Sequence, residues 1–146
     1  IPTNPELERQ LRHEGIGQPR RIVDDSVEPI YGLVAIGLEP SLWAFTASQV
    51  KTADELRAYF DKALDEQRLG TALPFATIDV ASGRVCGSTR FGNLVREHRR
   101  VEIGWTWLGT AFQRSARNTE AKLLMLQHAF ETWGCRRVEF KTSSTN

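Results

Sequence analysis

The sequence has only two cysteines, Cys86 and Cys135, and three histidines among its 146 residues. Two cysteines cannot build a disulfide framework or a four-cysteine zinc site, so we expect free thiols in a reducing compartment. Histidines this scattered make a metal site unexpected. No uncharged segment approaches the ~18 residues of a membrane span, and the first residues lack the basic and apolar regions of a signal peptide. We therefore expect a cytoplasmic protein without a metal or a membrane partner.

An excess of charge of one sign is also missing. Lys and Arg total 19 against 18 for Asp and Glu, which leaves a net charge of +1. That balance is too small to draw the whole molecule to a nucleic acid or to an anionic membrane. Contact with nucleic acid is therefore unexpected, and any anion site must be local. The hydrophobic share of 40% is ordinary for a globular domain.

The chain divides into two regions of different composition. Residues 1–29 hold four of the six prolines and few apolar residues, which predicts an irregular N-terminal arm. Residues 30–146 predict one folded domain. Its expected elements are a strand at Tyr31–Leu38, a helix from Thr52 to about Arg68, strands at Phe75–Val80, Arg84–Phe91 and Val101–Leu108, a helix at Thr119–Gly134 and a strand at Arg137–Thr142.

Local signals support these elements and their order. Thr52 followed by Glu55 forms a capping box, which marks a helix start, and Gly70 suits the end of that helix. The helix that joins strands 101–108 and 137–142 needs a right-handed crossover, so those two strands should be parallel. We therefore predict an α+β fold around a mixed, mainly antiparallel sheet.

The strand at 101–108 carries the first candidate for chemistry. Regular alternation places the carboxylate of Glu102 and the side-chain-free Gly104 on one face, and glycine in a strand often marks a close approach to the backbone. A solvated carboxylate on the wet face of the sheet is the alternative interpretation. The same alternation places Thr106 and Leu108 on the face of Glu102, and Val101, Ile103, Trp105 and Trp107 on the opposite face.

A polar loop with Arg114 and Arg117 leads from this strand into the next helix, whose expected N-cap is Asn118. The exposed N–H groups of a helix start carry partial positive charge and bind anions, the more so beside arginines. The pattern predicts an anion-binding cleft, with ordinary solvated arginines as the alternative. His128 lies on the inner stripe of that helix and is expected to be a packed core residue.

Several segments in order resemble one family: LWAFT, LPFATIDVASGRVCGSTRF, EIGWTWL, NTEAKLL, HAFE and RRVEFKT. They are similar to the GNAT N-acetyltransferase superfamily, and most to its branch of ribosomal-protein N-terminal acetyltransferases. The resemblance runs from about Leu42 to Asn146. It implies helices on both faces of the sheet and two splayed parallel strands. Because the chain stops at Asn146, it also implies that a C-terminal helix and further strands are missing here.

The resemblance implies that acetyl-CoA lies between the splayed strands. The main chain of Trp107 and Leu108 would then bind the pantetheine arm, with Asn146 beside it. The loop and helix start would bind the pyrophosphate through the family's Gln/Arg-x-x-Gly-x-Gly/Ala motif. Ala116 and Asn118 depart from its small-residue positions, which leaves the geometry of that contact open. The residues implied at this loop are Gln113, Arg114, Ser115, Ala116, Arg117, Asn118 and Thr119.

The implied activity is direct transfer of an acetyl group from acetyl-CoA to a primary amine. Glu102 would act as the general base, and the acid for the leaving thiolate would lie on a helix beyond Asn146. Two alternatives stay open: a non-catalytic acyl-CoA-binding or regulatory module on the same fold, and an RNA- or ribosome-associated protein that uses the basic run at 96–100. The sequence identifies neither the acceptor nor the oligomeric state, a homodimer included.

Overall fold

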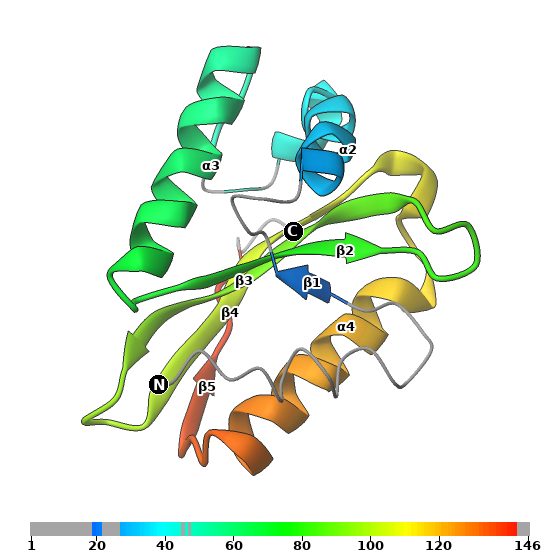
Figure 1. Cartoon of the computed structure of the whole chain (residues 1–146). Helices are drawn as coiled ribbons and strands as arrows, with labels where there is room; N and C mark the ends of the chain where they lie inside the picture. Colours follow the sequence, from blue (N-terminus) through cyan, green and yellow to red (C-terminus); the bar gives the residue numbers. More distant parts are fainter. Residues whose placement is uncertain (1–18, 22–26, 45, 47, 143–146) are drawn as a thin grey trace.

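The sheet has five strands in the order β1-β2-β3-β4-β5, with helices on both of its faces. The structure, a computed structural model, describes residues 19–21, 27–44, 46 and 48–142. Helices α2 and α3 lie over one face and α4 lies over the other (Figure 1). The elements are β1 (Pro19–Arg21), α2 (Val27–Gly37), η1 (Pro40–Trp43), α3 (Ala53–Arg68), β2 (Leu73–Ile78), β3 (Val85–Val95), β4 (Arg100–Leu108), η2 (Thr110–Phe112), α4 (Ala116–Gln127), η3 (His128–Thr132) and β5 (Arg137–Glu139).

This architecture confirms the predicted α+β fold. The capping box of α3 is present, because Thr52 Oγ1 accepts from the N–H of Glu55 and the Glu55 side chain accepts from the N–H of Thr52. Strands β2 and β3 form the expected antiparallel hairpin. The β4 and β5 strands are parallel, as the crossover required.

The expected strand at 31–38 is wrong, because residues 31–37 belong to helix α2 and residue 38 to the turn that follows it. A short apolar run does not distinguish a buried strand from a buried helix. Two glycines let this helix pack closely: a Cβ at Gly32 would lie 2.8 Å from Cβ of Val85, and one at Gly37 would lie 2.9 Å from Cδ2 of Leu56. Leu33, between them, is fully buried.

The N-terminal arm is not irregular where the structure describes it. Residues 19–21 form β1, which pairs antiparallel with β2, and residues 27–29 begin helix α2. The remaining positions of the arm, 1–18 and 22–26, lie outside the described residues. The domain boundary between residues 29 and 30 stays a prediction.

A β-bulge in β4 overturns the expected faces of this strand. Ser88 pairs with Trp107 and Arg90 pairs with Gly104, so two β4 residues stand opposite one β3 residue, and Trp105 has a φ of 51°. One extra residue reverses the alternation that follows it. Val101 and Ile103 therefore pack with Met125 of α4. Trp107 packs on the opposite face, in the cluster that contains Leu56 and Phe60 of α3.

Strand β4 pairs with β5 only over its first three residues. The ladder joins Arg100–Glu102 to Arg137–Glu139, and its last partners are Glu102 and Glu139. Beyond them β4 runs on to Leu108 without a β5 partner among the described residues, because β5 ends at Glu139. The last strand is shorter than the predicted 137–142, and Phe140, which follows it, is 53% exposed.

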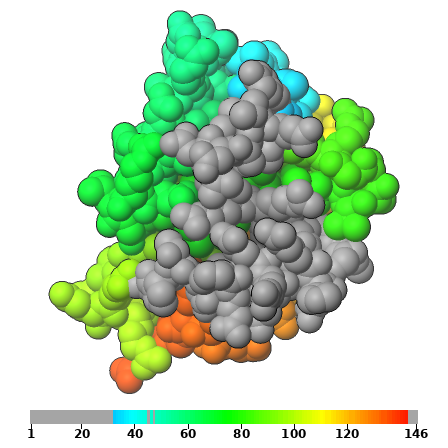
Figure 2. Space-filling model, viewed as in Figure 1, coloured from blue at the N-terminus to red at the C-terminus, as the bar shows by residue number. Residues whose placement is uncertain are grey.

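Helix α4 begins three residues earlier than predicted. Its N-cap is Ser115, so Asn118 lies in the first turn and is not the cap. The expected helix to Gly134 is interrupted, because residues 128–132 form the π-helical turn η3. The β3–β4 loop lies against the chain that follows this turn, where the N–H of Arg136 donates to the Arg99 carbonyl (2.7 Å). Figure 2 shows this neighbourhood in yellow-green and orange.

Candidate functional site

Glu102 is buried, with 4% of its surface exposed. Two donors hold its Oε2 atom: Nδ2 of Asn93 and Nζ of Lys141, each at 2.7 Å. Asn93 lies in a bulge of β3 and has a φ of 47°, and Lys141 lies just past β5. The interpretation of Glu102 as a solvated carboxylate is therefore wrong. A buried carboxylate held by a cation and an amide keeps one fixed orientation.

The second oxygen of Glu102 faces Gly104, as the sequence predicted for these two positions. A Cβ at Gly104 would lie 3.3 Å from Oε1 of Glu102, and among the described residues the only other atom within 4 Å is Cγ of the same glutamate. The absent side chain therefore leaves room beside Oε1. A ligand atom placed over Gly104 could exchange a proton with this oxygen.

A stacked arginine that the sequence did not indicate lies on the α3 side of the sheet. The guanidinium of Arg90 stands 5.1 Å from the ring centre of Tyr59 and 5.0 Å from that of Trp105, and it pairs with Glu66 of α3 at 3.1 Å. Burial raises the pKa of Tyr59 above its ordinary value, although Arg90 opposes this. Only the bulge at Trp105 brings these rings together, and it leaves no signature in the sequence.

The start of α4 is a helix N-terminus without a side-chain cap. Ser115 makes no capping bond to the helix, and its Oγ donates instead to the carbonyl of Phe112 at 2.6 Å. Nε2 of Gln113 donates to the carbonyl of Leu108 at 3.0 Å. The first N–H groups of a helix lack intrahelical partners, so those of α4 can receive an anion. Arg114 beside them is exposed and has a φ of 54°.

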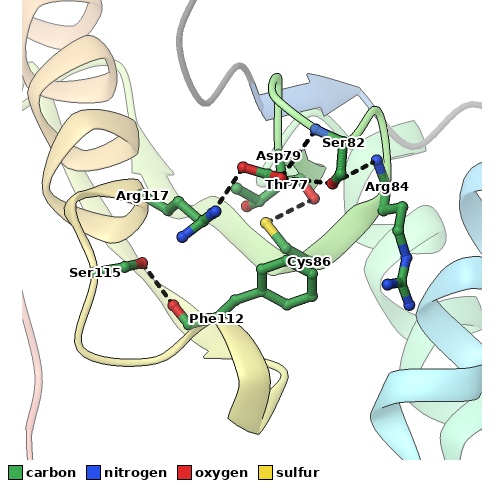
Figure 3. Close-up of polar contacts among 8 residues, drawn as sticks. All are labelled: Thr77, Asp79, Ser82, Arg84, Cys86, Phe112, Ser115 and Arg117. Atoms are coloured by element: carbon green, nitrogen blue, oxygen red, sulfur yellow. Dashed lines mark hydrogen bonds and ion pairs between the residues drawn. The ribbon is translucent and has the colours of Figure 1, made fainter.

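Arg117 is bound to a carboxylate of its own chain, which the sequence did not indicate. Its Nε donates to Oδ1 of Asp79 at 2.8 Å, and Oγ of Ser82 donates to the other oxygen, Oδ2 (Figure 3). These bonds, first that of Arg117 and then that of Ser82, hold the pKa of Asp79 below its usual range. The guanidinium also stands 5.2 Å from the ring centre of Phe112. Arg117 thus ties the start of α4 to the β2–β3 turn.

The other predicted contacts follow β4 toward α4. Trp107 and Leu108 are buried at the end of β4, and Nε1 of Trp107 has no hydrogen-bond partner among the described residues. Ala116, Asn118 and Thr119 are exposed in the first turn of α4. Asn146 lies outside the described residues. Glu102 and the end of β4 are six residues apart, about 20 Å along a strand, so a ligand that reaches both must be long.

His128 is a packed core residue and the two cysteines are free thiols, as the sequence predicted. Burial, and then the nearby charge of Asp79, raises the pKa of Cys86 to about 11. Burial also raises the pKa of Cys135. His128 is 7% exposed against the rings of Phe91 and Trp133, and burial lowers its pKa to about 4. His128 is therefore neutral near pH 7.

Neither a membrane span nor a metal cluster occurs in the described part of the chain. None of its helices has the length and apolar character needed to cross a bilayer. Within the same residues, no three side chains of His, Cys, Asp or Glu gather where they could hold a metal ion.

Comparison with known proteins identifies the family to which this chain belongs. The model of the acetyltransferase (GNAT) domain matches residues 20–146. A structure from T. thermophilus, described as an acetyltransferase, is 27% identical with a TM-score of 0.68, over 88% of this chain and 69% of that one. A GCN5-related N-acetyltransferase from Brucella melitensis is 28% identical with a TM-score of 0.69, over 80% of this chain and 53% of that one.

A third structure shares the fold at lower identity. A ribosomal-protein α-N-acetyltransferase in complex with coenzyme A is 17% identical with a TM-score of 0.73, over 90% of this chain and 73% of that one. No curated protein matches the sequence. The chain thus spans between about half and three-quarters of the length of these three structures.

Proposed function

Because the chain belongs to the acetyltransferase (GNAT) domain family, we propose that it transfers an acetyl group from acetyl-CoA to a primary amine by direct attack. The acceptor is a protein N-terminus or a small molecule, and the branch of the family that we propose for the chain is that of the ribosomal-protein N-terminal acetyltransferases. The observation that carries the proposal is the buried Glu102, held at Oε2 and open at Oε1 over Gly104. It lies in the strand whose far half has no β5 partner among the described residues.

The free edge of β4 and the uncapped start of α4 suit a long anionic thioester. The N–H groups of Ala116 and its neighbours, together with Arg114, would hold the pyrophosphate. The main chain of Trp107 and Leu108 would hold the pantetheine arm. Arg117 has a different role from the one expected, because Asp79 already binds it: it fixes the loop whose amides meet the phosphates.

The proposed chemistry uses the two oxygens of Glu102 differently. Asn93 and Lys141 fix Oε2, so Oε1 accepts the proton of the amine that lies over Gly104. The amine nitrogen then attacks the thioester carbonyl, a main-chain N–H of β4 stabilises the oxyanion, and the C–S bond breaks to release the CoA thiolate, which takes up the proton that the nitrogen loses as the amide forms. The acetyl amide and CoA are the products.

Calorimetry with CoA and an acetyl-transfer screen against a panel of primary amines test this proposal in the protein as its gene encodes it. Binding and turnover together would support an acetyltransferase. Binding without turnover on any amine would favour the second candidate, a non-catalytic acyl-CoA-binding or regulatory module. Absence of CoA binding would refute both.

A further inference from the structure

A half-buried lysine lies beneath the β4 bulge on the α4 side of the sheet. Lys122, in the second turn of α4, donates through Nζ to Oγ1 of Thr89 in β3 at 3.0 Å and to Oγ1 of Thr106 in β4. The two hydroxyl oxygens are themselves 2.8 Å apart. Thr106 is one of the two bulge residues, and Thr89 is the residue opposite them. One ammonium group thus joins α4, β3 and the bulge.

This ammonium has no carboxylate partner among the described residues. The strands packed against it present the hydroxyls of Thr89 and Thr106. Their charged residues, Arg90, Arg100 and Glu102, are bound to Glu66, Glu139 and Lys141. The nearby α4 side chain is the uncharged Met125, whose sulfur lies 3.8 Å from Thr89 Oγ1. Burial lowers the pKa of Lys122 to about 8. A half-buried lysine without a partner of opposite charge costs stability, and such groups are often functional.

The position of Lys122 relates it to the proposed reaction. Thr106 directly precedes Trp107 and Leu108, whose main chain would hold the pantetheine arm and thereby position the thioester at its end. Because Lys122 binds the hydroxyls of Thr106 and Thr89, it fixes the angle by which the bulge turns β4. That angle sets the direction of the main-chain N–H groups of Trp107 and Leu108. A displacement of about 1 Å in such groups can lower a rate by roughly 10²-fold.

We propose that Lys122 is a positioning residue of the acetyl-transfer site, whose ammonium holds the β4 bulge through Thr106 and Thr89. The proposal rests on the proposed acetyltransferase function. It separates activity from stability: Lys122→Met removes an unpaired, half-buried charge, so the melting temperature should not fall, whereas kcat should. A residue with a merely structural role would lose stability and keep the kcat of the folded fraction.

The test measures kcat, the KM for acetyl-CoA and the melting temperature of the wild type, Lys122→Met, Lys122→Arg and the exposed control Lys51→Met between pH 6.5 and 9.5. We expect Lys122→Met to lose about 10²-fold in kcat with less than about threefold change in KM, and Lys51→Met to match the wild type. Wild-type kcat should fall as pH rises through about 8, where Lys122 loses its proton. Lys122→Arg should restore activity without that decline, because arginine stays charged.

The proposal would be overturned if Lys122→Met kept the kcat of the wild type. It would also be overturned if kcat declined at alkaline pH to the same extent in the wild type and in Lys122→Arg. A readout that needs no turnover separates its failure from that of the proposed function. Trp105 and Trp107 flank Thr106, so wild-type tryptophan fluorescence should change with a midpoint near pH 8, and that of Lys122→Arg should not. The change would support the inference even if no amine were acetylated, and its absence in the wild type would refute it.

Discussion

The two faces of the sheet differ in whether the titratable groups packed against them have partners of opposite charge. On the α3 side each buried charge has a partner of opposite sign, Arg90 with Glu66 and Glu102 with Lys141. On the α4 side, the half-buried Lys122 and the buried His128 lack one among the described residues, and burial lowers the pKa of each. A partner of opposite sign stabilises the charged form of a buried group, whereas burial without a partner favours its neutral form. The α4 side should therefore supply the sensitivity of the site to pH.

Breaking the paired face at Glu102 should have the largest effect. Glu102→Gln keeps the size of the side chain but cannot accept the proton of the amine, so we expect kcat to fall by about 10²–10⁴-fold. CoA affinity, measured by calorimetry, should hardly change, because the phosphates bind at the other end of β4. Glu97→Gln, in the exposed β3–β4 loop, is the control. Unchanged turnover in Glu102→Gln would remove Glu102 from the role of base.

On the unpaired face, His128 should make stability depend on acidity. Its folded pKa of about 4 lies below the ordinary 6.5, so the neutral form is favoured in the fold. This contribution is complete above pH 6.5 and is lost as pH falls toward 4, by at most roughly 3 kcal/mol. Urea unfolding at pH 7 and pH 4 measures it, with His128→Phe as the comparison. If the wild type and the variant lose equal free energy between these pH values, His128 is not buried as described.

At the α4 start we expect a smaller effect. Arg114→Ala together with Arg117→Ala should weaken CoA binding by about tenfold, because the first removes a charge-assisted contact and the second releases the loop. Arg84→Ala, an exposed arginine of the neighbouring turn, is the matched control. Equal CoA affinity in the double variant and the control would place the phosphates elsewhere.

The smallest expected effect concerns the two thiols. Burial raises the pKa of Cys86 to about 11, whereas Cys135 is partly exposed. Only the thiolate is alkylated, so iodoacetamide at pH 8 should label Cys135 first. Mass spectrometry of the peptides measures the order. Faster labelling of Cys86 would contradict the packing between β2 and β3.

Patterns over neighbouring residues predicted much of the fold. The capping box at Thr52 marked α3, and alternation marked the β2–β3 hairpin and the strand that carries Glu102 and Gly104. The crossover rule gave the parallel pairing of β4 and β5. Helix α2 was mistaken for a strand because a short, uniformly apolar run has no period that separates the two.

Interactions between distant residues could not be predicted. Arg117 and Asp79 are 38 positions apart, and Lys141 and Glu102 are 39 apart, and no local signal links them. The bulge at Trp105 leaves no mark in composition, yet it decides which face receives Trp107 and Thr106. For the same reason, the sequence does not distinguish Lys122 from an ordinary helix lysine, because its contact with Thr106 depends on the bulge.

Amide hydrogen exchange with and without CoA tests most directly whether the free edge of β4 binds the thioester. Residues 106–108 and the first turn of α4 should gain protection when CoA binds, because their N–H groups would then donate to it. Residues 100–102, already paired with β5, should not change. Protection confined to 100–102, or none from 106 to 118, would contradict the proposed site.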